Sequence, residues 1–152
     1  PRARLTPVYD NRIPAGIPLP SLDVLEAALP DLATAAQSVY DAWDQVDGFD
    51  EELGTGGICQ DIASAMVETL SAHGVEHALS VHAAVGENHV FVVALLGDGV
   101  YEIDIPPHVY ETGSGYTWAK KPGVAMTGKD VVFTRLSGPV DPDTFLRDYS
   151  DG

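Results

Sequence analysis

The 152-residue chain has little cysteine, few basic residues and no long apolar run. Its single cysteine, Cys59, cannot form a disulfide within the chain and cannot by itself build a zinc cage, so nothing requires an oxidising compartment. No apolar run approaches the roughly 18 residues that span a bilayer. No signal peptide is visible, and we therefore expect a cytoplasmic protein or a part of a larger secreted polypeptide.

Basic residues are scarce relative to acidic ones: 8 Lys and Arg stand against 23 Asp and Glu, and the net charge is −15. Such a surface repels phosphate backbones and anionic lipid, which argues against nucleic acid and membrane surfaces as partners. The acidic excess has two interpretations. It keeps the protein in solution, or it attracts a basic partner or substrate.

Length and proline pattern divide the chain into an arm and one domain. Repeated prolines predict that residues 1–20 form an extended arm, either a linker or the remnant of a propeptide. Residues 21–152 are predicted to form a single domain. Ser21 is a good N-cap for a helix that starts at Leu22, and Pro30 is expected to break this helix. Helical periodicity resumes from Asp31 to about Val46.

The remaining elements follow from periodicity and from turn residues. A helix is predicted over Ile58–His73, with Gly74 as its stop. Tyr110–Gly128 reads as an irregular, glycine-rich segment, and a short helix is predicted from Asp141. The predicted strands are Val75–Val85, His89–Leu96, Val100–Ile105 and Asp130–Leu136. Helices that precede a run of strands predict an α+β fold with an antiparallel sheet.

Cys59 stands at the predicted start of a helix, directly behind glycines, in the stretch GTGGICQDIA. Free N–H groups and the positive end of the helix dipole favour a thiolate at this position, and the thiolate is the nucleophilic form. Gly57 leaves room for a substrate, and Gln60 can point toward it. Free cysteines are usually buried and inert, so the position alone leaves both a catalytic and a structural cysteine open.

A catalytic thiol needs a base, and the base needs a group that orients it. His89 opens the strand HVFVVALL, and Asp104 ends the strand VYEIDI. If Gly97 and Asp98 are the two turn residues, as a type II′ turn allows, His89 lies on the face of Asp104, roughly 7 Å away between backbones. A second register keeps both on one face, whereas a three-residue loop puts Asp104 on the opposite face.

The order of these three elements resembles the core of the transglutaminase-like branch of the papain-like cysteine enzymes. That family shows G-x-C-x-D-x-A, then H-A-W-V, then D-P, and this chain has G-I-C-Q-D-I-A, then H-V-F-V, then D-I-P. The resemblance covers about Gly54 to Pro107. It implies that a catalytic helix packs on the antiparallel sheet, with Cys59 as nucleophile, His89 as base and Asp104 as the orienting residue.

Two residues depart from the family pattern. Phe91 stands where the family has tryptophan, and Ile105 separates Asp104 from the proline. The backbone N–H of Cys59 can serve as one oxyanion donor. The second donor is open, with three candidates by residue type: Gln37, Trp43 and Gln45.

The resemblance implies a thiol-dependent acyl-transfer enzyme that acts on protein or peptide amides through a thioester. Glutamine deamidase, transglutaminase and cysteine peptidase, a thiol protease among the hydrolases, all fit this chemistry. The alternative is a catalytically silent domain of the same kind that serves as a binding or scaffold module. Trp118 is expected to line the substrate groove. With one cysteine the chain has no C-x-x-C pair, and we expect neither a metal nor another cofactor.

Overall fold

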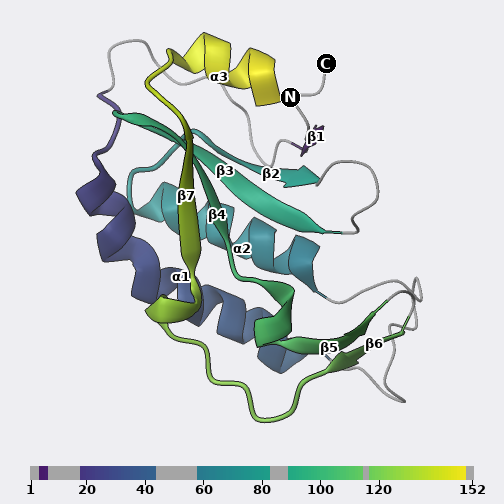
Figure 1. The fold of residues 1–152 in the computed structure, drawn as a ribbon. Helices are drawn as coiled ribbons and strands as arrows, with labels where there is room; N and C mark the ends of the chain where they lie inside the picture. The colour runs from purple at the N-terminus through teal and green to yellow at the C-terminus, as the bar shows by residue number, and fades with distance from the viewer. Residues whose placement is uncertain (1–3, 7–17, 44–57, 83–88, 115–116, 150–152) are drawn as a thin grey trace.

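The computed structural model describes residues 4–6, 18–43, 58–82, 89–114 and 117–149 (Figure 1). The helices are α1 (Leu22–Ala42), α2 (Cys59–Ala72) and α3 (Pro142–Tyr149), with short 3₁₀ turns η1 (Pro107–Val109) and η2 (Gly128–Asp130). The strands are β1 (Arg4–Thr6), β2 (Ala78–His82), β3 (Val90–Leu96), β4 (Gly99–Asp104), β5 (Glu111–Ser114), β6 (Thr117–Lys120) and β7 (Val132–Ser137).

The main sheet is antiparallel, with the strand order β1-β2-β3-β4-β7. This confirms the predicted α+β class with its antiparallel sheet. Residues Arg4–Thr6 of the expected arm belong to this sheet, because they pair with β2 at its edge. The segment predicted to be irregular, Tyr110–Gly128, contains a second, two-stranded sheet made of β5 and β6.

α1 is one helix of 21 residues, so the prediction that Pro30 breaks it is wrong. Proline removes one backbone donor and crowds the preceding turn, but Pro30 is exposed on the outer side of the helix. The opposite side packs against α2 through buried apolar side chains, among them Leu25, Leu32 and Ala36. This burial continues on both sides of the proline and keeps the helix intact. The helix ends at Ala42, before the predicted Val46.

α2 agrees with the prediction to within one residue at each end. Ile62, Met66 and Leu70 recur at helical spacing and are buried. Gly74 ends the helix with a positive φ of 90°, and the N–H of Val75 donates to the carbonyl of Leu70 at 2.8 Å. This is the left-handed helix stop for which glycine is suited.

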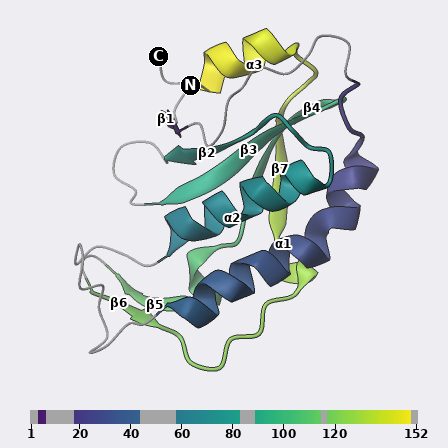
Figure 2. The same cartoon turned by 180° about the vertical axis from the view of Figure 1, so that it is seen from behind.

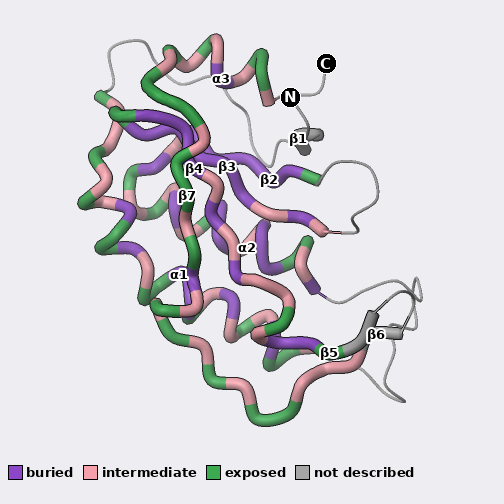
Figure 3. The backbone as a smooth tube through the Cα atoms, viewed as in Figure 1, coloured by how far each residue is buried: buried purple, intermediate pink, exposed green. Residues whose placement is uncertain are grey.

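The sheet separates two apolar cores. α1 and α2 cover one face of the sheet, and α3 lies on the other (Figure 2). Along β3, Val92 and Ala94 face the helix layer, while Val93 and Leu95 join the core under α3. Both faces of β3 are therefore buried, as Figure 3 shows for the central strands. A strand covered on both faces is continuously apolar, which explains the run VFVVALL.

The hairpin between β3 and β4 has the register in which Leu96 lies opposite Gly99. This confirms the arrangement with Gly97 and Asp98 as the two turn residues. The positive φ that a type II′ turn needs at Gly97 is found instead at Gly99, at 154°. A Cβ at Gly99 would lie 2.1 Å from the carbonyl oxygen of Ser137, so β7 approaches too closely for any other residue.

Phe145 is expected to be the main attachment of α3. Its side chain is fully buried against the outer face of the sheet, and its ring meets the ring of His77 edge-on at 6.5 Å. Phe145→Ala should lower the free energy of unfolding by about 3–5 kcal/mol, because it removes a fully buried aromatic side chain. Urea unfolding measures this. Val132→Ala is the control, since Val132 is 48% exposed, and it should change the value by less than about 0.5 kcal/mol. Equal effects of the two variants would contradict this packing.

No helix in the described part of the chain has both the length and the apolar character needed to cross a membrane.

Candidate active site

Three elements meet at one end of the main sheet. α2 begins there with Cys59, β3 begins just after His89, and β4 ends with Asp104. Figures 1 and 2, seen from opposite sides, both show the start of β3 beside the start of α2. The fold therefore brings the only cysteine of the sequence, a histidine and an aspartate to one end of the sheet from positions 59, 89 and 104.

His89 and Asp104 form a direct pair. The Nε2 atom of His89 lies 2.9 Å from Oδ2 of Asp104, and the two side chains are only 17% and 18% exposed. The register of the β3–β4 hairpin, extended beyond Val92 opposite Ile103, puts both residues on the same face of the two strands. The ring of Phe91 stacks on the imidazole with centroids 6.1 Å apart, which restricts its orientation. Phe91 thus supports the histidine from the position where the resemblance expects tryptophan.

The pKa of His89 is strongly perturbed. Burial lowers it, but the hydrogen bond to Asp104, the nearby Cys59 thiol and the charges of both groups outweigh burial and raise the pKa to about 10. The imidazole is therefore a cation at neutral pH. A histidine held as a cation by a carboxylate favours an ion pair in which the imidazole carries the proton of the thiol and the sulfur is a thiolate.

The second ring nitrogen of His89, Nδ1, is not used by Asp104. It is buried and has no hydrogen bond to a described atom, and the Cys59 thiol raises the pKa of this ring. Cys59 itself is a free, half-buried cysteine. Because Nε2 is occupied by Asp104, the arrangement leaves Nδ1 to exchange a proton with the sulfur. Asp104 in turn fixes which nitrogen faces the cysteine.

The raised pKa of His89 makes stability depend on pH. The folded state holds the His89 proton more tightly than the unfolded state, so the stabilisation is complete below about pH 6.5, declines as pH rises, and is lost near pH 10. The difference in free energy of unfolding between wild type and His89→Gln should therefore shrink from pH 6.5 to pH 10. Urea unfolding across this range measures it. A difference that stays constant with pH would contradict the raised pKa.

The N-terminal end of α2 supplies backbone donors beside the sulfur. No side chain in the described ranges caps this end, whose N-cap residue is Ile58. The N–H groups of the first turn are thus left without helical partners and can hold a developing negative charge. Gln60 and Asp61 are exposed on this first turn, so Gln60 is free to face a ligand as the sequence suggests.

The remaining sequence candidates have different outcomes. Gly57 and Gln45 lie outside the described residues, and Trp118 lies in β6, where its side chain is not described. Gln37 is unsuited as an oxyanion donor, because its amide bonds Asp41, the carbonyl of Val124 and the N–H of Met126.

Tyr110 is a residue of the site that sequence reasoning missed. It follows η1 directly and is fully buried, yet its hydroxyl has no hydrogen-bond partner among the described residues. Burial and the negative charges of Cys59, Glu111 and Asp104 hold its pKa above the usual value. Only its position six residues after Asp104 could have suggested it, because the irregular segment has no periodicity that identifies buried residues.

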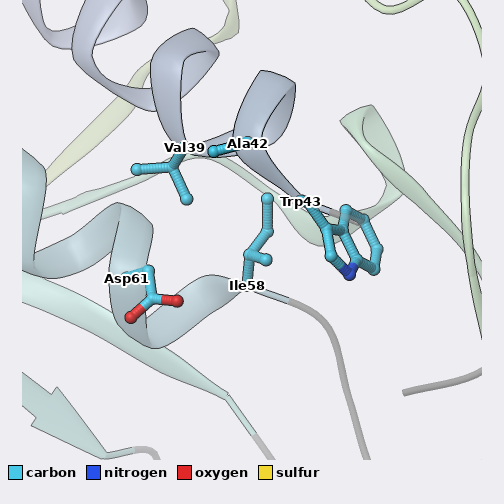
Figure 4. A pocket seen from close by; sticks show the side chains of 5 residues that line it. All are labelled: Val39, Ala42, Trp43, Ile58 and Asp61. Carbon is cyan, nitrogen blue, oxygen red and sulfur yellow. The ribbon is translucent and has the colours of Figure 1, made fainter. Parts of the chain in front are cut away.

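A pocket of about 400 Å³ lies where α1 ends and α2 begins. Five residues line it: Val39, Ala42, Trp43, Ile58 and Asp61 (Figure 4). Its walls are largely apolar, with the carboxylate of Asp61 at one side and the indole of Trp43 at the other. Ile58 precedes Cys59, so the pocket adjoins the start of the helix that carries the thiol.

Comparison with known proteins finds no matching family model, no matching curated protein and no matching solved structure. Within the ranges that the structure describes, no group of three or more His, Cys, Asp or Glu side chains is arranged to hold a metal ion.

Proposed function

We propose that the protein is a thiol-dependent acyl-transfer enzyme that acts on protein or peptide amides. One observation carries this proposal: a free cysteine at a helix N-terminus that no described side chain caps raises the pKa of a histidine whose Nε2 is bonded to a half-buried aspartate at 2.9 Å. This combination of nucleophile, base and orienting carboxylate is the recurrent device of nucleophilic acyl transfer. The α+β arrangement, with the cysteine helix packed on an antiparallel sheet, agrees with a transglutaminase-like or papain-like core.

The chemistry begins from the ion pair in which the proton of Cys59 already resides on Nδ1 of His89. The thiolate attacks the carbonyl carbon of an amide, and the backbone N–H of Cys59 stabilises the oxyanion. The C–N bond then breaks, His89 gives its proton to the departing nitrogen, and ammonia or an amine leaves while a thioester remains on Cys59. Water or a second amine, deprotonated by His89, attacks the thioester and regenerates the thiol. Asp104 stabilises the imidazolium at each of these proton transfers.

The pocket beside Cys59 indicates which substrates fit. Apolar walls with a carboxylate and an aromatic ring accept an apolar or cationic side chain next to the reacting amide. An anionic side chain would be repelled by Asp61 and by the net charge of −15. The substrate is therefore proposed to be a protein or peptide with apolar or basic residues near the reacting amide.

The test is product analysis on a glutamine-containing peptide with a lysine nearby. Ammonia release with a peptide that gains the mass of deamidation identifies a deamidase, and a cross-linked product in the presence of an amine identifies a transglutaminase. Cleavage of the backbone identifies a peptidase. Absence of all three products, with a set of peptides that vary the flanking residues, would reject the proposal in favour of a silent binding domain.

A further inference from the structure

Tyr110 brings a fourth polar group to the end of the sheet where the proposed triad lies. Its side chain is fully buried and belongs to the core against which Cys59 packs. Its hydroxyl nevertheless bonds no described atom. A buried hydroxyl without a partner costs about 1–3 kcal/mol, so such a group is rarely retained without a use. Nδ1 of His89 is a second buried polar atom without a hydrogen bond to a described atom. Cys59 contributes to the raised pKa of both His89 and Tyr110.

The backbone around Tyr110 is held firmly. Its N–H donates to the carbonyl of Pro107 at 3.0 Å, and its carbonyl accepts from the N–H of Lys121 at 2.9 Å. The adjoining hairpin is tied to the end of α1, since Nζ of Lys120 donates to the carbonyl of Trp43 at 2.7 Å and lies over the ring of Tyr40. The tyrosine is thus fixed relative to the helices.

The titratable groups that act on Tyr110 come from three elements. They are Cys59 of α2, Asp104 of β4 and Glu111 of β5, and Glu111 pairs across the small sheet with Lys120 of β6. Because burial and these negative charges raise its pKa, Tyr110 keeps its proton and acts as a donor. Asp104 already accepts the bond from His89 through Oδ2, and among the charges Cys59 acts most strongly on Tyr110.

We propose that the Tyr110 hydroxyl donates a hydrogen bond to the negative charge on the Cys59 sulfur when its proton has moved to His89. The inference rests on the proposed function, because it assumes that Cys59 reacts as a thiolate. A neutral donor that keeps its proton stabilises the thiolate without competing for the proton on His89. By stabilising the thiolate, Tyr110 then keeps Cys59 reactive at lower pH. In this state the Tyr110 hydroxyl has the thiolate sulfur as its hydrogen-bond partner.

The pH dependence of Cys59 alkylation tests this role. Iodoacetamide rates followed by intact-mass spectrometry give a midpoint for wild type, and Tyr110→Phe should raise that midpoint by about 1 to 2 pH units, as expected for loss of a hydrogen bond to a charged group. Tyr101→Phe is the matched control, because Tyr101 is a buried tyrosine whose hydroxyl bonds Asp98 at 3.0 Å beside the hairpin turn. The control should keep the wild-type midpoint.

Failure of this inference differs from failure of the proposed function. A low midpoint in wild type that Tyr110→Phe leaves unchanged overturns the role of Tyr110 alone. A wild-type midpoint near 8.5, as for an ordinary thiol, overturns both. If Tyr110→Phe does not fold, carbon-13 NMR of wild type labelled at tyrosine Cζ replaces it. The Tyr110 resonance should then shift with the ionisation of the Cys59–His89 pair and lose that shift in Cys59→Ala. A resonance that is the same in both proteins overturns the inference.

Discussion

Iodoacetamide at pH 6 is expected to alkylate Cys59 at least about ten times faster than an ordinary cysteine. An unperturbed thiol with a pKa of about 8.5 is only about 0.3% thiolate at this pH, whereas a thiol that has passed its proton to His89 is ionised. A thiolate of lower pKa is also less nucleophilic, which reduces the increase in alkylation rate. The expected factor is therefore smaller than the ratio of the two thiolate fractions.

His89→Ala should remove this reactivity, so that its alkylation rate at pH 6 falls about tenfold or more toward that of a free thiol. His73→Ala is a close control, because His73 also bonds an aspartate, Asp31, at 2.9 Å, but at the far end of α2. The control should label like wild type. Slow labelling of wild type that only unfolding accelerates would mean that Cys59 is a structural cysteine.

Cys59→Ser is expected to abolish ammonia release from a reactive glutamine peptide, with a loss of at least about a thousandfold. A hydroxyl in place of the thiol is a far weaker nucleophile at this site. Asp104→Asn should cost about a hundredfold or more, because an amide does not stabilise the imidazolium and can hold the ring in the wrong tautomer. Ammonia assayed at several peptide concentrations separates the loss of rate from any loss of binding.

The pair Asp31 and His73 again provides the control for the aspartate. Asp31→Asn breaks a histidine–aspartate contact of the same length, 2.9 Å, on an exposed surface between α1 and α2. It should leave ammonia release unchanged. If Asp104→Asn were also without effect, Asp104 would be a structural partner of His89 and would have no part in the chemistry.

Periodicity predicted those elements in which the apolar pattern of the sequence matches the residues that are buried in the structure. α2 has a clear apolar stripe and a glycine stop, and β3 and β4 are joined by a turn short enough to restrict the register to a few choices. The pairing of His89 with Asp104 follows from that register, and it was therefore accessible from the sequence. The placement of Cys59 near this pair depends on how α2 packs on the sheet, which periodicity does not predict; for it the sequence offers only the family resemblance.

The elements that were mispredicted are those fixed by distant contacts. Pro30 has an unfavourable local effect, but packing of α1 against α2 outweighs it. β5 and β6 are only four residues long each, and their position depends on bonds of Lys120 and Lys121 to Trp43 and Tyr40, far away in the sequence. Tyr110 lies at the start of this hairpin, and its burial in the core cannot be derived from neighbouring residues.

The most direct test of the central claim is to trap the acyl intermediate. Wild-type protein mixed with a reactive glutamine peptide is quenched in acid within the first turnover, and tandem mass spectrometry locates the attached group. We expect a peptide thioester on Cys59, no adduct in Cys59→Ala, and slower formation in His89→Ala. Product release from wild type with no thioester, or with undiminished release in Cys59→Ala, would contradict the assignment of Cys59 as the nucleophile.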